Sequence, residues 1–239
     1  MTVALVTGAA RGLGHEVARQ LAAEGLTVYV AARDPGAAAA AAQELAGDGD
    51  VRALPVGLDV SDPASVAGAA RALTDDPGRL DVLVNNAAAY VDWSETATSA
   101  DLDAARTVME TNLFGAWRLT QALLPLLRAG AAPRVVNVSS GAGSHGDTAF
   151  GLTVRGGAAA TYGISKAALN ALTSTLAAEL GRDVLVNSVC PGLTATYPGA
   201  EAMGARPVAE SAKGVVWAAT LPADGPTGGS FRDGQPLLW

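Results

Sequence analysis

Short apolar runs alternate along the chain with longer segments in which apolar residues recur every three or four positions. The short runs predict buried strands, and the longer periodic segments predict helices. The predicted strands are residues 3–6, 27–31, 51–60, 80–84, 134–138, 184–189 and 228–231. The predicted helices are residues 13–25, 37–45, 64–74, 99–112, 113–127, 161–181 and 208–221. This alternation predicts an α/β fold, a doubly wound parallel sheet of about seven strands with right-handed crossovers and helices on both faces.

Length and composition favour one packed domain over residues 1–239. Of the 239 residues, 49% are hydrophobic and 16% are charged, and no segment has the composition of a linker. One sizeable core is therefore expected, without the bias that marks disordered chains.

Charge and cysteine content exclude several classes of protein. The net charge is −7, and Lys166 and Lys213 are the only lysines, so no basic tract invites nucleic acid or an anionic membrane. No apolar run reaches the roughly 18 residues of a membrane span, and the N-terminus does not resemble a leader, so we expect a cytoplasmic protein. The single cysteine, Cys190, forms no zinc set with His15 and His145, so we expect no metal and a buried, hydrophobic thiol.

The first predicted strand runs into a glycine-rich turn, residues 7–14, before the first helix. Gly8, Gly12 and Gly14 allow the backbone to turn tightly, while the free N–H groups and dipole of the helix favour a phosphate there. The spacing differs from the GxGxxG pattern of many dinucleotide-binding folds. A purely structural turn is the alternative, but the position between a strand and a helix favours cofactor binding.

Charged residues after the second strand bear on the choice of cofactor. Arg33 and Asp34 stand where dinucleotide folds contact the ribose 2′ position, and Arg11 in the glycine turn can converge there. A cation pairs with a 2′-phosphate, whereas a carboxylate accepts from a free 2′-hydroxyl. We favour the two arginines and therefore NADP(H). The alternatives are Asp34 with NAD(H), or a solvated strand end without a ligand.

Further polar residues lie at strand ends or within a helix. Asp59 follows the third strand, where ligands bind in such sheets, although capping of a loop is an equal alternative. Asn85 and Asn86 open a segment of small residues, 85–88, that admits a cofactor, and their amides can tie neighbouring strands together. Asn112 lies inside a predicted helix, where propensity disfavours asparagine, which indicates a polar task.

Tyr162 and Lys166 lie four residues apart at the start of a predicted helix and so share one face. A phenol has a pKa of about 10, and a nearby cation lowers it, so such a tyrosine can give or take a proton. An ordinary amphipathic helix is the alternative. The fifth strand delivers Ser139 and Ser140 to the same edge of the sheet.

Together these residues resemble the short-chain dehydrogenase/reductase family, which has a Rossmann-like fold, over essentially the whole chain. The matched motifs are the TGxxxGxG loop, an adenine-contacting acid, a catalytic tetrad and a nicotinamide-amide segment. They are carried by Thr7, Gly8, Gly12, Gly14, Asp59, Asn112, Ser140, Tyr162, Lys166, Pro191, Gly192 and Thr196. By the same resemblance, the cofactor contacts also include Arg11, Leu13, Arg33, Val60, Asn86, Ala87, Ala88 and Leu193. Ser140 is preferred to Ser139 because residues 140–143 resemble the stretch that begins at the family's catalytic serine.

The resemblance implies an enzyme that transfers hydride between NADP(H) and a small carbonyl or alcohol substrate, similar to carbonyl reductases. Tyr162 would give or take the proton, and Ser140 would hydrogen-bond the substrate oxygen. Lys166 would lower the pKa of the tyrosine and bind the nicotinamide ribose, while Asn112 would hold a water of the proton relay.

The chain departs from the family pattern in two places. Ala88 stands where the family usually has glycine, so an extra methyl group lies on the path of the cofactor. The interval from Ser140 to Tyr162 is longer than usual, and residues 141–161 form a long loop that is either functional or mobile. Residues 197–207, broken by glycine and proline, are suited to a lid.

Assembly and two other functions are open at this point. The resemblance implies a homodimer or homotetramer formed by the helices in 99–127 and 161–181, unless the long segment before Tyr162 covers that face and leaves a monomer. An epimerase or dehydratase acting on a nucleotide sugar would need a larger substrate domain. A regulatory protein that senses a nucleotide without chemistry would not need Tyr162 and Ser140 together.

Overall fold

The computed structural model describes residues 2–239, and these form one eight-stranded sheet. The strands are β1 (Val3–Thr7), β2 (Thr27–Ala31), β3 (Val51–Ala53), β4 (Val82–Asn85), β5 (Arg134–Val138), β6 (Leu185–Val189), β7 (Ser230–Arg232) and β8 (Gln235–Pro236). Their order is β3-β2-β1-β4-β5-β6-β7-β8, and every neighbouring pair is parallel except β7 with β8. The predicted doubly wound parallel sheet is confirmed, and β8 is an added antiparallel strand. The prediction of one domain is compatible with this sheet and stays a prediction.

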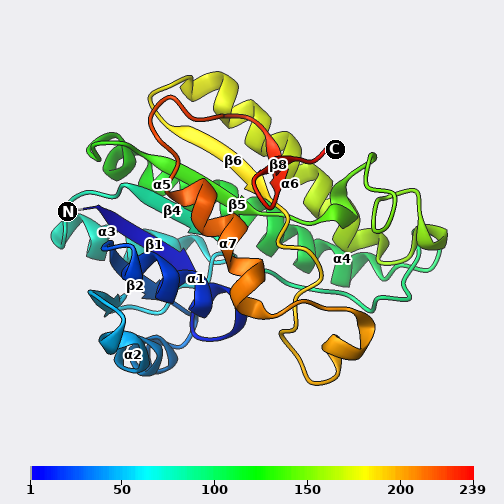
Figure 1. Cartoon of the computed structure of the whole chain (residues 1–239), viewed down its shortest axis with the longest axis horizontal. Coiled ribbons are helices and arrows are strands. Elements are labelled where there is room, and N and C mark those ends of the chain that lie inside the picture. Colours follow the sequence, from blue (N-terminus) through cyan, green and yellow to red (C-terminus); the bar gives the residue numbers. More distant parts are fainter. Residues whose placement is uncertain (1) are drawn as a thin grey trace.

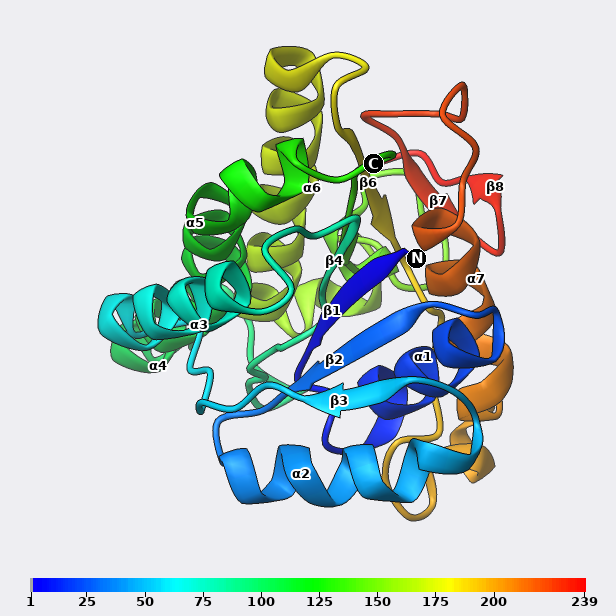
Figure 2. The same cartoon turned by 90° about the vertical axis from the view of Figure 1, so that its left-hand side faces the viewer.

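Helices cover both faces of the sheet (Figure 1). On one face lie α1 (Gly12–Ala23), α2 (Pro35–Glu44) and α7 (Val208–Ala219). On the other lie α3 (Pro63–Asp75), α4 (Leu102–Met109), α5 (Ala116–Arg128) and α6 (Ala160–Leu180), and Figure 2 shows the two layers on either side of the strands. Among the helices of residues 2–239, none combines the length and apolar character that crossing a bilayer requires.

Alternate side chains of each central strand enter two separate cores, because successive side chains point to opposite faces. In β1, Val3 and Leu5 join the core that lies against α3, α5 and α6, whereas Ala4 and Val6 join the core against α1, α2 and α7. Both faces are covered, which explains why these strands read as continuous apolar runs. Burying one such valine or leucine stabilises the fold by about 1.5–3 kcal/mol.

The third strand is much shorter than the predicted 51–60 and ends at Ala53. Beyond it, backbone hydrogen bonds to the sheet continue at Leu54, which donates to Val30, and at Leu58, which donates to Ala32. After Leu54 the next such bond comes only from Leu58, four residues later, so the regular pairing with β2 is lost beyond Leu54. The prediction of a strand through residue 60 is therefore wrong.

The predicted helix at 99–112 begins later, at Leu102, because Asp101 caps it by accepting from the N–H groups of Asp103 and Ala104. This helix continues into α5 through a wider π-helical turn, Glu110–Gly115, which contains Asn112. Such turns are frequent at functional sites. Pro125, predicted to bend or end the helix, lies inside α5, which continues to Arg128.

Buried polar side chains tie the ends of β4 and β5 to the helices behind them. The amide of Asn85 donates to the Oδ1 of Asn137 (2.9 Å) and to the hydroxyl of Thr120 in α5 (3.2 Å). The amide of Asn137 donates to the hydroxyl of Thr173 in α6 (2.9 Å). The prediction that an asparagine ties neighbouring strands is borne out at Asn85.

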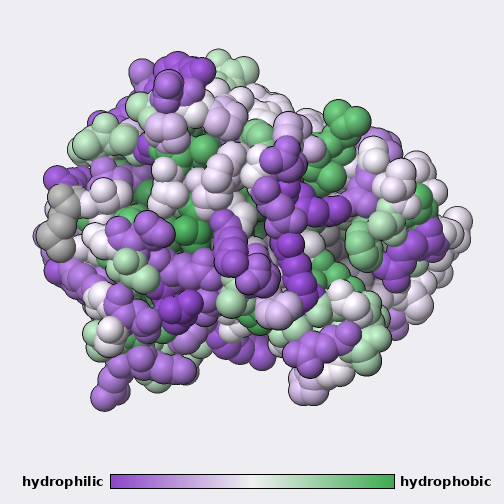
Figure 3. Space-filling model, in the orientation of Figure 1, coloured by the Kyte–Doolittle hydropathy of each residue, from purple (hydrophilic) through white to green (hydrophobic). Residues whose placement is uncertain are grey.

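The C-terminal tail runs back along the sheet towards the loop after β5. The N–H of Leu237 donates to the carbonyl of Ser230 (2.8 Å), and the hydroxyl of Ser144 donates to the carbonyl of Leu238. Figure 3 shows this side of the molecule, where hydrophobic residues form separate patches among hydrophilic ones.

Candidate active site

The carboxyl ends of β1, β4, β5 and β6 meet at one edge of the sheet, and α6 begins beside that edge (Figure 1). The first turn of α6 carries Tyr162, and Lys166 follows one turn later. The N-cap residue of α6, Ala159, has a left-handed backbone (φ 55°) and no side-chain oxygen to cap the helix. Glu95, from the loop after β4, accepts instead from the N–H of Thr161 (3.0 Å). The start of α6 is therefore held by a residue distant in sequence.

The phenol of Tyr162 is buried, and the side chain of Ser140 lies beside it. Its ring stacks on Tyr90, with centroids 5.3 Å apart and planes at 22°, and meets Trp93 edge to face at 5.3 Å. Burial raises the pKa of Tyr162 and the Tyr90 phenol adds to this, while the nearby hydroxyl of Ser140 lowers it. The phenol is therefore protonated at neutral pH and can donate its proton.

The side chain of Lys166 is buried, with Nζ 5.6 Å from the centroid of the Tyr162 ring. The Nζ donates to the carbonyl oxygen of Val138 (2.8 Å), the last residue of β5. Burial lowers the pKa of Lys166 to about 8. The predicted lowering of the Tyr162 pKa by this cation is wrong for this structure, because burial dominates the titration of the phenol and Lys166 points at Val138.

The two serines at the end of β5 point in different directions. Ser139 is buried and donates to the Oδ1 of Asn170 in α6 (2.6 Å), which is a structural contact. Ser140 instead presents its hydroxyl to Tyr162, and its Oγ also accepts from the N–H of Ala142 (3.2 Å). The structure therefore brings Ser140, and not Ser139, to the phenol.

Asn112 fastens the loop that follows β4. Its Oδ1 accepts from the N–H of Ala89 (2.8 Å), and its Nδ2 donates to the carbonyl of Ala89 (3.0 Å) and to Ser165 (3.0 Å). Both N–H groups of the amide are thus used by the protein. The polar task predicted for this asparagine is, in this structure, a clamp on Ala89.

The glycine turn has the geometry that a dinucleotide phosphate requires. Gly8 and Gly12 have left-handed backbones, each with φ 62°, a region that other residues rarely adopt. A Cβ on Gly14 would lie 2.4 Å from the Nδ2 of Asn86 and 2.6 Å from the carbonyl of Gly8. The N-cap of α1, Arg11, contributes no side-chain hydrogen bond to the helix, so the first N–H groups of α1 are available to an anion.

The segment after β4 closes one side of this turn. The Nδ2 of Asn86 donates to the carbonyl of Thr7 (2.8 Å), and the hydroxyl of Thr7 accepts from the N–H groups of Asn86 (2.9 Å) and Ala87 (3.0 Å). Ala88 continues this segment. The predicted cofactor residues of the two loops are thus brought together.

The acids and arginines expected at the adenosine end have distinct tasks. Asp34 caps α2, with its Oδ1 accepting from the N–H of Gly36 (2.8 Å). Asp59 accepts from the N–H (2.9 Å) and hydroxyl (2.6 Å) of Ser61, and these bonds, together with nearby Arg33, lower its pKa. Arg11 and Arg33 are exposed, and neither forms a salt bridge or side-chain hydrogen bond within the described residues.

The segment after β6 lies against the glycine turn. The methyl group of Thr196 is 3.6 Å from the point that a Cβ on Gly12 would occupy. The carbonyl of Pro191 accepts from the Nε (3.0 Å) and Nη2 (2.6 Å) of Arg206. The carbonyl of Leu193 accepts from the backbone N–H of Arg206 (2.9 Å). Gly192 has φ 75°. Farther along the same edge, the carbonyl of Val60 accepts from Arg118 (2.9 Å), and Leu13 packs partly buried in the first turn of α1.

Cys190 is buried as predicted, but its sulfur also has a polar role. It accepts from the N–H groups of Gly141 (3.1 Å) and Gly192 (3.4 Å) and from the Nη2 of Arg232 (3.2 Å). The expectation of a purely hydrophobic thiol is therefore wrong. The reason is that β6 ends where backbone groups of two turns converge on the sulfur.

Three residues around Tyr162 were not predicted from the sequence: Tyr90, Trp93 and Glu95. They lie in an irregular loop, so no periodicity marks them. The available signal was two aromatic residues close together in a chain that is only 5% aromatic.

The family profile described as short chain dehydrogenase matches residues 2–203 of this chain. The chain belongs to the short-chain dehydrogenase family. A rhamnolipids biosynthesis 3-oxoacyl-(acyl-carrier-protein) reductase of Pseudomonas aeruginosa is 38% identical to it over 195 residues, which cover 80% of this chain and 72% of that protein.

Solved structures of other short-chain dehydrogenases have the same architecture. The RhlG/NADP active-site complex of Pseudomonas aeruginosa has a TM-score of 0.80 and 34% identity, covering 98% of this chain and 95% of that one. The NADPH-bound carbonyl reductase from chicken fatty liver has a TM-score of 0.82 and 28% identity, covering 100% of both chains. These relatives are reductases, so this short-chain dehydrogenase is an oxidoreductase at the level of its family.

The burial of Lys166 gives a pH test of the folded site. The pKa of Lys166 is about 8 in the folded chain, below its ordinary value of 10.5. Between these two pH values the unfolded state binds the proton and the folded state does not, so stability rises with pH. Relative to Lys166→Met, the cofactor-free wild type should gain about 2–3 kcal/mol of unfolding free energy from pH 8 to pH 10.5, measured by urea denaturation.

The matched control is Lys213→Met, because Lys213 is exposed and pairs with Glu210 at the surface. Its stability curve should run parallel to that of the wild type. A Lys166→Met curve that also runs parallel would show that Lys166 is not disfavoured in its charged form.

Proposed function

We propose that this protein is an NADP(H)-dependent oxidoreductase that interconverts a carbonyl compound and an alcohol by hydride transfer, with Tyr162 as general acid and base. The observation that carries the proposal is the buried phenol of Tyr162, which lies beside Ser140 and has the Nζ of Lys166 5.6 Å from its ring centroid. The relatives support a carbonyl as the reacting group, because they are oxoacyl and carbonyl reductases.

The side chains divide the chemistry between them. When bound, the reduced nicotinamide supplies two electrons to the carbonyl carbon as a hydride. The hydroxyl of Ser140 hydrogen-bonds the carbonyl oxygen and orients it, and Tyr162 transfers its proton to that oxygen. One carbonyl compound, one NADPH and one proton give one alcohol and one NADP⁺, and Tyr162 is reprotonated from solvent. Because burial raises the pKa of Tyr162, the phenol holds its proton before substrate binds, as reduction of a carbonyl requires.

The residues that would hold the cofactor fit a dinucleotide with a 2′-phosphate. The first N–H groups of α1 and the glycine turn suit the pyrophosphate. Asp34 is engaged as the cap of α2, which opposes its use as a ligand of a 2′-hydroxyl. Arg33 and Arg11 are exposed cations near that position, and the RhlG and chicken carbonyl reductase structures hold NADP and NADPH.

A nucleotide-sensing protein without chemistry is the weaker alternative. Sensing requires the glycine turn but gives no reason for a buried phenol that lies beside a serine and a buried lysine. The cytoplasmic location stays a prediction.

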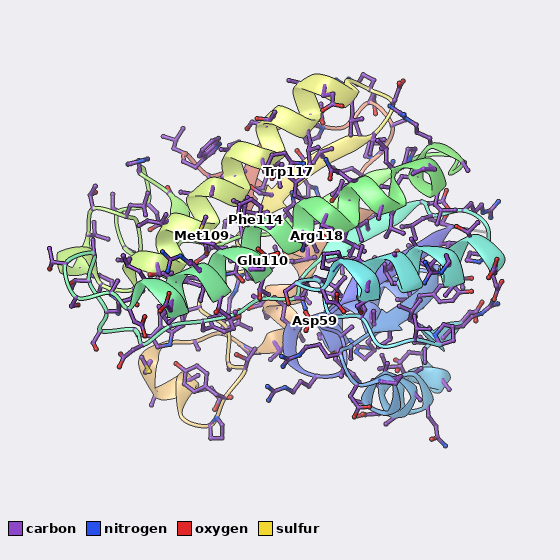
Figure 4. The ribbon with its side chains drawn as sticks, turned by 180° about the vertical axis from the view of Figure 1, so that it is seen from behind. Asp59, Met109, Glu110, Phe114, Trp117 and Arg118 are labelled. Atoms are coloured by element: carbon purple, nitrogen blue, oxygen red, sulfur yellow. The ribbon has the colours of Figure 1, made fainter. Side chains whose placement is uncertain are left out.

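We propose in addition that the chain forms a homodimer or homotetramer through α5 and α6. Phe114 and Trp117 are exposed on the outer side of the α4–α5 run, where Figure 4 shows them next to Met109 and the Glu110–Arg118 ion pair. Trp117 also borders a shallow groove between α5 and α6 that is lined by Leu124, Leu176 and Leu180. The long loop 141–161 leaves Phe114 and Trp117 exposed, which favours assembly over a monomer.

Replacing Tyr162 with phenylalanine tests the general acid. The variant loses one hydroxyl and little volume, so ketone-dependent oxidation of NADPH should fall at least about 100-fold while NADPH affinity, measured by fluorescence titration, stays within about twofold. Tyr29→Phe is the control, because the Tyr29 hydroxyl contacts Asp76 far from the site. A Tyr162→Phe enzyme with more than about a tenth of normal activity would remove Tyr162 from this role.

Replacing Arg33 with alanine tests the cofactor preference. Losing a charge-assisted hydrogen bond should raise the KM for NADPH about tenfold or more and leave that for NADH nearly unchanged. Asp34→Ala should weaken α2 without improving or impairing NADH binding, because Asp34 acts as a helix cap. The preference for NADP(H) is refuted if the wild type uses NADH better, or if Arg33→Ala affects both cofactors equally.

Light scattering tests the assembly. The wild type should have a mass of two or four times the 23.8 kDa of the chain. Trp117→Arg, which places a charge on the proposed interface, should shift it towards the monomer, whereas Met203→Arg on the lid segment should not. A monomeric wild type at micromolar concentration contradicts the proposal.

A further inference from the structure

The loop 89–95 is fastened at both ends beside the phenol of the site. At the first end, Asn112 binds both backbone groups of Ala89, at 2.8 and 3.0 Å. At the second, the carboxylate of Glu95 accepts from the N–H of Thr161 in α6 (3.0 Å). Side chains between these two points are therefore positioned by the π-helical turn at one end and by α6, the helix that carries Tyr162, at the other.

Two aromatic residues fill this fastened loop, and both contact Tyr162. Tyr90 and Trp93 lie 5.8 Å from each other and each 5.3 Å from the Tyr162 ring, measured between centroids. Yet 61% of Tyr90 and 48% of Trp93 are exposed. Each ring thus packs on the proton donor with one part and leaves the remainder uncovered, which is unusual for large apolar groups held in place.

Tyr90 is also coupled electrostatically to the proton donor. The phenol of Tyr90 contributes to the raised pKa of Tyr162, and its ring stacks on the Tyr162 ring while 61% of the residue stays exposed. An uncovered part of Tyr90 therefore lies close to the phenol of Tyr162.

Two arginines near Ser140 and the segment after β6 are paired with carboxylates. Arg232, which lies against Gly141 beside Ser140, forms a salt bridge with Asp147. Arg206 pairs with Asp233 at 2.7 Å. Neither of these two guanidinium groups is a free cation for an anionic group of a substrate.

We propose that Tyr90 and Trp93 form an aromatic wall of the substrate pocket that selects carbonyl compounds bearing a flat aromatic group next to the reacting carbonyl. A flat ring can stack on the uncovered surfaces of this wall while its carbonyl reaches Tyr162 and Ser140. A flexible aliphatic chain makes weaker contacts with the same surfaces and loses more rotational freedom on binding. The inference rests on the proposed function and names the substrate class of that site.

Two α-diketones that differ in the group beside the dione separate the effect of the ring from that of the reacting group. In 1-phenylpropane-1,2-dione a phenyl ring flanks the diketone, whereas 2,3-hexanedione carries a short alkyl chain. The wild type should have the higher kcat/KM for the phenyl compound. Since one aromatic pair is worth about a factor of two to ten, Trp93→Ala and Tyr90→Ala should each lower the phenyl-to-alkyl ratio of kcat/KM by about that factor.

The control variants are chosen to separate stacking from other effects. Tyr90→Phe keeps the ring and should keep the preference, while Trp117→Ala removes an exposed tryptophan on the outer side of α5 and should change kcat/KM for neither substrate. Trp93→Leu, which keeps apolar bulk without a ring, replaces Trp93→Ala if circular dichroism shows that the alanine variant does not fold. Most of the loss should lie in KM for the phenyl compound.

Two results overturn the wall: a wild type that prefers 2,3-hexanedione, or wall variants that lower kcat/KM for both diketones by the same factor. Failure of the proposed function gives a different result, namely that no carbonyl compound is turned over with NADPH. In that case, the affinity of the NADPH-loaded chain for 1-phenylpropane-1,2-dione, measured by calorimetry, still tests the aromatic wall. Affinity weakened by Trp93→Ala and unchanged by Trp117→Ala supports the wall, and equal affinity in all three proteins refutes it.

Discussion

The hydrogen bond between the side chains of Asn85 and Asn137 aligns the ends of β4 and β5, and most of the site depends on it. The residues that follow β4 build the side of the glycine turn and the aromatic loop, and those that follow β5 include Ser140. The same two amides reach α5 and α6 through Thr120 and Thr173. Because each donor and acceptor in this network is buried, breaking one link would leave a polar group without a partner, which costs about 1–3 kcal/mol.

The site combines this rigid frame with groups that the fold tolerates poorly. A buried ammonium and a buried phenol lie within one turn of α6, and burial disfavours the charged form of both. The same desolvation keeps the proton on Tyr162 until a substrate oxygen arrives. Burying these two groups lowers the stability of the fold, but it does so at the site where a defined protonation state is useful.

Sequence patterns were sufficient for the sheet and for most of the candidate site. Alternating apolar runs identify a doubly wound sheet because parallel strands are buried on both faces. The motif residues Gly8, Ser140, Tyr162 and Lys166 then fall at strand ends or at the start of a helix, where the topology brings them to one edge.

What the sequence did not determine depends on contacts between distant segments. The strand predicted to reach residue 60 stops at Ala53, because beyond Leu54 the chain leaves the register with β2 and donates to it again only at Leu58. The pKa of Tyr162 is raised because its ring is enclosed by the protein, and the spacing of Tyr162 and Lys166 in the sequence does not reveal this burial. The aromatic loop 89–95 was not predicted because an irregular segment shows no repeating pattern of apolar residues. The role of Glu95 was not predicted either, because the helix that it caps lies more than sixty residues away in the sequence.

The hydrogen bond from Ser144 to the carbonyl of Leu238 has a practical consequence for how this protein is handled. The described C-terminal end is attached to the loop that borders the site, whereas the N-terminal end of β1 lies at the opposite edge of the sheet (Figure 1). Any polypeptide joined after Trp239 must leave the molecule beside the 141–161 loop. An affinity tag, fusion partner or immobilising surface attached at the other terminus leaves that loop undisturbed.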